Sequence, residues 1–181
     1  MIQRKRGGLL MVALLVSFDA SGSELKASGS GLRVEFQAIG RPSALKVKGK
    51  SEDASGVVQA EKNRFTGTFS LPVKSLKTGI ELRDRHLQEK YLDAEKFPLI
   101  LLQVKGDLPS SGEGLFEGEL DLHGKKVPVK GALAGYVMKE GKASFSASFS
   151  ISLSQFEIAI PKYLGITIAD RVDVTVDAQL K

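Results

Sequence analysis

Residues 143–153 read ASFSASFSISL, and this stretch is the clearest evidence for the fold class. Apolar side chains alternate with serine at every step, so one face of the segment is apolar and the other is small and polar. Alternation with a period of two is typical of a β-strand, in which successive side chains point to opposite faces of a sheet. Serine and β-branched residues also oppose a helix. The stretch is therefore predicted to be a strand with one buried face.

The same alternation recurs at short spacing along the chain. It covers residues 32–38, 45–50, 64–71, 116–122, 127–131 and 171–178. Around eight strands, each with one apolar face, predict an all-β fold that is either a closed barrel or a sandwich. Glycines within these patterns, at 67, 118, 131 and 135, permit the bends and close approaches that barrel closure requires. The lysines at 46, 48 and 50 form a polar face that protects a sheet edge.

One strand breaks the alternation, because Leu99, Ile100, Leu101 and Leu102 are all apolar. Both faces of this strand are therefore expected to be covered. The obvious cover is the segment that precedes it, which has a different period.

That segment, around residues 78–91, is predicted to be helical. Thr78 and Glu81 match the T-x-x-E pattern of a capping box, in which the two side chains accept hydrogen bonds from backbone N–H groups of the first turn. Pro98 prevents the helix from continuing. One face of the helix carries Ile80, Asp84, Leu87 and Tyr91, and the far side carries Leu82 and His86.

The first 22 residues carry the features of a signal peptide. Arg4, Lys5 and Arg6 form a basic start, an apolar run follows over residues 9–18, and small residues at 20–22 fit a cleavage site. The run is shorter than the roughly 20 residues that a membrane-spanning helix needs, and no other segment is long enough. We therefore expect a periplasmic or secreted protein with no stable membrane span, and a single domain over residues 23–181.

The composition excludes several kinds of chemistry. The chain has no cysteine, which removes disulfides, thiolate ligands and cysteine nucleophiles. Residues 23–181 hold 23 basic and 20 acidic residues, a balance too even to indicate nucleic-acid binding. A metal site needs several converging ligands, and the two histidines, His86 and His123, offer no such set, so none is expected. Nine phenylalanines and no tryptophan suit a wholly apolar lining or core.

One polar cluster lies on the predicted helix, at Arg83, Asp84, Arg85 and His86. A carboxylate buried at Asp84 would need a partner, and Arg83 beside it would pin the helix over the barrel. The alternative is direct contact between this cluster and a ligand. The structural role is favoured, because buried charges are generally paired.

Residues 75–98 resemble the signature of the YceI-like family. Its pattern, S-x-x-T-x-x-x-x-R-D-x-H-L … F/Y-P, is matched from Ser75 to Leu87 and again at Phe97-Pro98. Residues 118–129 resemble the family's G-x-L-x-L-H-G-x-x-x-P-V hairpin, and residues 149–176 resemble its C-terminal strands. The opening strand, residues 31–38, keeps the alternation but lacks the histidine that is usual in the family.

The resemblance implies an extended eight-stranded antiparallel lipocalin-like barrel with one short helical insertion. It also implies an exported protein that holds a polyisoprenoid, quinone-like or long-chain fatty molecule and catalyses no reaction. No cofactor is expected other than such a lipid; the oligomeric state is open, a homodimer being one arrangement. The family-motif polar cluster consists of Thr78, Arg83, Asp84 and His86. The expected barrel lining consists of Phe36, Phe65, Phe69, Leu87, Tyr91, Phe97, Phe116, Phe145 and Phe149.

Two other functions remain open. An eight-stranded barrel can be filled by its own side chains, which would make the chain a structural or partner-binding module without a ligand. A cavity of several hundred Å³ would favour a ligand site instead. An enzyme acting on an isoprenoid would need titratable groups inside the barrel, and Asp84 with His86 is the only candidate pair.

Overall fold

The computed structural model describes residues 22–28, 31–41, 45–110, 112–163 and 166–181. The predicted signal peptide lies outside these ranges, apart from Gly22. Eleven strands of the described residues form one antiparallel sheet, which confirms the all-β class with more strands than the eight expected. The strands are β1 (Ser23–Ser28), β2 (Leu32–Arg41), β3 (Lys46–Ser51), β4 (Ser55–Glu61), β5 (Arg64–Pro72), β6 (Leu99–Asp107), β7 (Gly114–Leu122), β8 (Lys125–Lys139), β9 (Lys142–Ser152), β10 (Lys162–Tyr163) and β11 (Ile166–Leu180).

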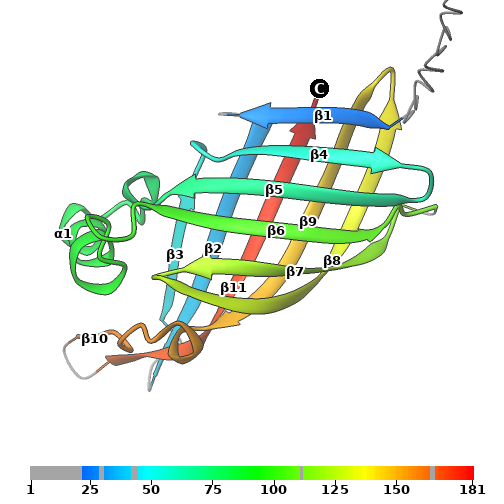
Figure 1. Cartoon of the computed structure of the whole chain (residues 1–181). Helices are drawn as coiled ribbons and strands as arrows, with labels where there is room; N and C mark the ends of the chain where they lie inside the picture. The colour runs from blue at the N-terminus through cyan, green and yellow to red at the C-terminus, as the bar shows by residue number, and fades with distance from the viewer. Residues whose placement is uncertain (1–21, 29–30, 42–44, 111, 164–165) are drawn as a thin grey trace, which may run out of the picture.

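The sheet curls around an apolar interior, with strand order β1-β4-β5-β6-β7-β8-β9-β11-β2-β3 and β10 paired to β11 (Figure 1). β1 and β4 were not foreseen from the alternation, since β1 is short and β4 contains two adjacent valines. β3 is an edge of this order, as its lysines predicted, and Lys46, Lys48 and Lys50 are exposed.

Both edges of the sheet are tied by pairs of backbone hydrogen bonds. Lys26 of β1 exchanges two bonds with Lys181, with N···O distances of 2.8 and 2.9 Å. Lys50 of β3 exchanges two bonds of the same lengths with Lys77, in the segment that follows β5. These contacts satisfy part of each edge, which lowers the tendency of an exposed strand to pair with another chain.

The helical segment is shorter and less regular than its sequence predicted. It consists of α1 (Glu81–Arg85) and one π-helical turn, η3 (His86–Tyr91); shorter 3-10 turns are η2 (Val73–Ser75) and η4 (Leu153–Phe156). The predicted capping box is wrong, because the N-cap of α1 is Ile80 and makes no side-chain capping bond. Gly79, with φ of 82°, turns the chain between Thr78 and the helix, so the Thr78 hydroxyl does not cap the helix and donates to the Asp84 carboxylate instead.

The expectation that both faces of β6 are covered is also wrong. Leu99 and Leu101 are 48% and 39% exposed on the outer face, whereas Ile100 and Leu102 face the interior. Figure 1 shows α1 beyond the ends of β5 and β6 rather than across their outer surface. Single exposed leucines are common on protein surfaces, so an apolar run alone does not establish a second cover.

Candidate functional site

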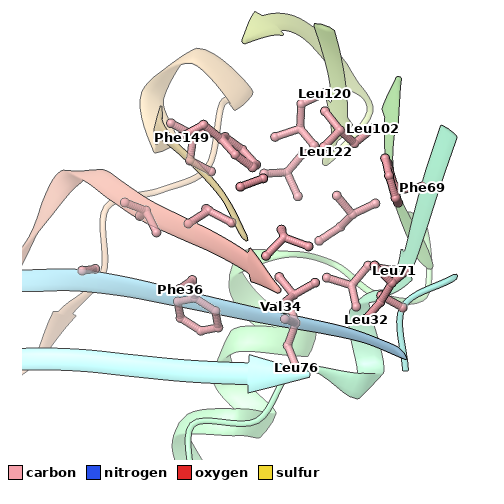
Figure 2. A pocket seen from close by; sticks show the side chains of 18 of the residues that line it. Leu32, Val34, Phe36, Phe69, Leu71, Leu76, Leu102, Leu120, Leu122 and Phe149 are labelled. Carbon is pink, nitrogen blue, oxygen red and sulfur yellow. The ribbon is translucent and has the colours of Figure 1, made fainter. Parts of the chain in front are cut away.

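The interior of the curled sheet contains a cavity of about 890 Å³. Aliphatic and phenylalanine side chains from the inner faces of the strands supply most of its wall. Figure 2 shows Phe36, Phe69 and Phe149 approaching this space from different strands. A volume of this size lies within the range of about 300–1,000 Å³ that ligand pockets occupy. The barrel is therefore not filled by its own side chains.

Eight of the nine side chains expected to line the barrel do border the cavity. They are Phe36, Phe65, Phe69, Leu87, Tyr91, Phe116, Phe145 and Phe149.

Phe97 is the exception and does not border the cavity. Its ring packs edge-on against the ring of His123, with 4.9 Å between the centroids, and it also contacts Gly124. The sequence predicts Phe97 in the lining as part of the helical cover, together with Leu87 and Tyr91, and this prediction is wrong. The chain has already turned outward there, toward the β7–β8 hairpin.

Large and small residues alternate in a row across the inner wall. From β5 to β9 the paired positions are Phe65, Gly106, Phe116, Gly131 and Phe149. The row continues through Val174 and Phe36 to Gly49. These pairings follow from the strand register and could not be read from the alternation of single strands.

Each glycine in this row gives a neighbouring ring the space to lie against the backbone. A Cβ atom at Gly131 would lie 2.5 Å from the Cε1 and Cζ atoms of Phe116, and one at Gly106 would lie 2.8 Å from Cε1 of Phe65. The rings of Phe116 and Phe149 meet edge-on with centroids 6.0 Å apart. From β5 to β9 the rings of this row lie on every second strand, so each ring has room to lie along the wall beside a glycine.

The polar cluster is organised around Thr78. The Thr78 backbone N–H donates to Oδ1 of Asp84 at 2.6 Å, and the Thr78 hydroxyl donates a second, short hydrogen bond to the same oxygen. Arg83 donates from Nε to Oγ1 of Thr78 at 2.8 Å and from Nη2 to its carbonyl oxygen at 2.9 Å. Thr78 therefore links the guanidinium to the carboxylate, in place of the direct Arg83–Asp84 pairing that the sequence suggested.

The four residues of this cluster divide between two environments. Asp84 is 8% exposed and does not border the cavity. Thr78, Arg83 and His86 do border it. Asp84 thus pins the helical segment to the preceding loop, whereas the other three residues belong to the cavity wall.

One broad face of the helical segment borders the cavity, whereas Glu81, Arg85 and Glu89, on its other side, do not line the cavity. Leu82 and His86, predicted to lie on the far side, line it together with Leu87 and Tyr91. The polar part of the wall also includes Lys90, Lys162 from β10 and Ser70 from β5. Among the described residues that line the cavity, none is acidic.

His123 has a structural position away from the cavity. With Gly124 it forms the two-residue turn between β7 and β8, with φ values of 55° and 72°, and such turns require positive φ at both positions. Its Nδ1 lies 3.1 Å from the carbonyl oxygen of Phe156, within hydrogen-bond distance. Within the described ranges, no group of three or more His, Asp or Glu side chains is placed to hold a metal ion.

Among the described residues, no helix is both long and apolar enough to cross a membrane.

The fold and the cavity define a lipocalin-like β-barrel with a large apolar interior. A family model described as "YceI-like domain" matches residues 18–180, and the chain therefore belongs to the YceI-like family. This confirms the resemblance read from residues 75–98.

Solved structures with the same fold include BcnA of Burkholderia cenocepacia, with a TM-score of 0.67 and 17% sequence identity over 82% of this chain and 96% of that chain. A polyisoprenoid binding domain from Saccharophagus degradans has a TM-score of 0.63 and 11% identity over 88% of this chain and 98% of that one. The Campylobacter jejuni YCEI protein has a TM-score of 0.57 and 23% sequence identity over 74% of this chain and 83% of that chain. No curated protein matches the chain significantly. At these identities the similarity establishes the fold.

Proposed function

We propose that this chain is an exported lipid-binding protein that holds a polyisoprenoid, quinone-like or long-chain fatty molecule in its cavity. The observation that carries the proposal is the apolar cavity of about 890 Å³. The Saccharophagus degradans neighbour, named as a polyisoprenoid binding domain, supports the same class of ligand. The basic start and the short apolar run of the first 22 residues support export.

The cavity wall suits a long hydrocarbon chain. Each methylene transferred from water contributes about 0.8 kcal/mol, so ten methylenes contribute about 8 kcal/mol. The loss of translational and rotational freedom on association opposes binding by about 4 kcal/mol or more. Binding then needs few polar contacts. It also discriminates weakly among chain lengths, because one methylene changes the affinity only about fourfold.

Binding without catalysis is favoured over an enzyme. The carboxylate of Asp84 accepts two hydrogen bonds from Thr78 and lies outside the cavity wall. That carboxylate is therefore not placed to exchange a proton with a bound molecule, and His86 is left without the partner that the enzyme hypothesis required.

Native mass spectrometry of the purified protein, with lipid extraction and identification, tests this function. We expect a population heavier than the polypeptide by the mass of one lipid. The N-terminus measured in the same experiment shows whether the first 22 residues are removed, and the intact mass shows whether the protein is a monomer or a homodimer. A protein that carries no lipid and takes up none from added isoprenoid or fatty acid would refute the proposal.

A matched pair of variants makes the test specific to the cavity. Val174 borders the cavity between Phe36 and Phe149, whereas Leu115 is 76% exposed and does not border it. Overfilling a packed site costs about 1–3 kcal/mol, so Val174→Trp should lower lipid affinity about 5- to 150-fold. Leu115→Trp should bind as the wild type does. Circular dichroism checks that both variants are folded.

A further inference from the structure

The rim of the cavity carries large apolar side chains that are exposed to water. Leu45, Ile80 and Leu82 are 45%, 54% and 49% exposed, and all three border the cavity. Leu45 immediately precedes β3, and Ile80 and Leu82 belong to the helical segment, which is distant from it in sequence. Exposed apolar side chains gathered around a cavity opening are typical of a surface that meets another apolar phase.

Cationic side chains border the same opening. Lys90 and Lys162 are exposed residues of the cavity wall. Neither takes part in any of the ion pairs formed between described residues. Arg83 also borders the cavity and uses its Nε and Nη2 groups on Thr78.

Carboxylates are kept away from this wall. Asp84 is buried against Thr78, and Glu81 and Glu89, although exposed on the same helical segment, do not border the cavity. The residues that line the cavity here are therefore apolar, neutral polar or positively charged and never acidic, which is the composition that favours the surface of a bilayer with anionic lipids.

We propose that the cavity opening docks on the surface of a bilayer containing anionic lipid, and that the ligand passes directly between bilayer and cavity. This inference rests on the proposed lipid-binding function. A long-chain lipid is poorly soluble in water because each methylene exposed there is unfavourable. An opening pressed against the lipid headgroups lets the chain leave the bilayer without crossing water, with Ile80 and Leu82 in the interfacial layer.

A second copy of this chain fits the opening less well than a bilayer does. A symmetric dimer through the opening would bring the same patch of each copy together. Lys90 and Lys162 of one copy would then face a rim that has the same charge. An anionic lipid surface instead complements these cations, and each lysine near that surface raises the affinity about fivefold.

Sedimentation with lipid vesicles tests the docking. The protein is purified as it is expressed, with any lipid that it carries. The vesicles contain phosphatidylcholine with or without phosphatidylglycerol. We expect binding to the anionic vesicles that weakens as salt is added. Lys90→Gln with Lys162→Gln should lower this binding about 25-fold, at about fivefold for each lysine. Ile80→Ser with Leu82→Ser should also lower it.

The β8–β9 hairpin supplies a matched control. It carries Val137 and Met138, which are 55% and 43% exposed, beside Lys139 and Lys142, and none of the four borders the cavity. Figure 1 places this hairpin on the other side of the molecule from α1. Val137→Ser, Met138→Ser, Lys139→Gln and Lys142→Gln together remove the same chemistry as the two rim variants, so this variant should still bind anionic vesicles.

Ligand exchange provides a second measurement. Transfer by docking should accelerate in proportion to the concentration of anionic vesicles and slow in the rim variants. Transfer through water would be independent of vesicle concentration and would overturn the inference. Equal vesicle binding by wild type and rim variants, loss of binding only in the hairpin variant, or self-association through the rim without vesicle binding would overturn it as well.

Native mass spectrometry separates this inference from the proposed function. A protein that retains lipid but ignores vesicles refutes the docking and leaves the lipid-binding function intact. A protein that binds vesicles but never carries a lipid refutes the lipid-binding function, and with it the exchange at the opening.

Discussion

Replacing Thr78 by valine should destabilise the protein through the polar cluster at the helical segment. Thr78→Val keeps the shape of the side chain and removes only its hydroxyl. That hydroxyl donates to Asp84 and accepts from Nε of Arg83 at 2.8 Å. Hydrogen bonds to charged groups contribute about 1.5–3 kcal/mol each. The variant loses two such hydrogen bonds.

The loss is partly offset by contacts that the substitution leaves in place. Asp84 keeps the Thr78 backbone N–H at 2.6 Å, and Arg83 keeps the Thr78 carbonyl oxygen at 2.9 Å. Two charged hydrogen bonds sum to about 3–6 kcal/mol, and because of these remaining contacts we expect a smaller loss of about 2–3 kcal/mol in the free energy of unfolding. For a chain of this length the melting temperature should fall by about 4–12 °C.

Urea unfolding followed by circular dichroism measures this loss, because a shift in midpoint at constant slope reports stability. Ser55→Ala is the matched control: its hydroxyl lies 2.9 Å from the Ser70 hydroxyl in an exposed pair, and its removal should cost less than about 0.5 kcal/mol. An unchanged midpoint for Thr78→Val, or an equal loss in Ser55→Ala, would show that Thr78 does not link Arg83 to Asp84.

Three further substitutions test other parts of the structure. Gly131→Ala places a Cβ atom 2.5 Å from the ring of Phe116, so it should lower stability by about 1–3 kcal/mol in urea unfolding and reduce lipid occupancy in native mass spectrometry. Phe97→Ala should lower the melting temperature through the lost contact with His123 yet keep its lipid, and loss of lipid would contradict the position assigned to Phe97. The Ser154 backbone N–H donates a hydrogen bond to Asp170 and lowers the pKa of that carboxyl below 3.8. The ionised carboxylate therefore stabilises the folded protein above that pH, and this stabilisation is lost as the pH falls through the lowered pKa. Asp170→Asn should therefore be less stable than wild type at neutral pH, with a difference that shrinks in acid; a constant difference would count against this origin.

The local pattern of the chain was sufficient to predict most of the strands. The alternation in residues 143–153 corresponds to β9, and the edge lysines correspond to β3. The six lining phenylalanines of the strands follow from the same rule, because alternate side chains of a strand share a face, whereas Leu87 and Tyr91 come from the helical segment. The motif in residues 75–98 is sufficient to identify the family, since it combines specific residue types at fixed spacing.

The predictions for β6, the helix cap and Phe97 are wrong because the environment of each residue depends on segments distant in sequence or on a local turn. The apolar run at Leu99 and Leu101 predicted a cover that does not exist, because burial depends on what packs there and not on the run itself. Thr78 and Glu81 have the spacing of a capping box, but the turn at Gly79 separates Thr78 from the helix. Phe97 follows the helical segment and yet points to His123.

The period of each strand, the apolar face that it buries and the family of the chain can all be read from local sequence. That the barrel is hollow depends on how the strands pack together. The cavity depends on the register that sets Phe65, Phe116 and Phe149 alternately with Gly106 and Gly131 across neighbouring strands. Alternation is a property of each strand alone, whereas the volume enclosed depends on the curvature of the whole sheet and on which side chains meet across it.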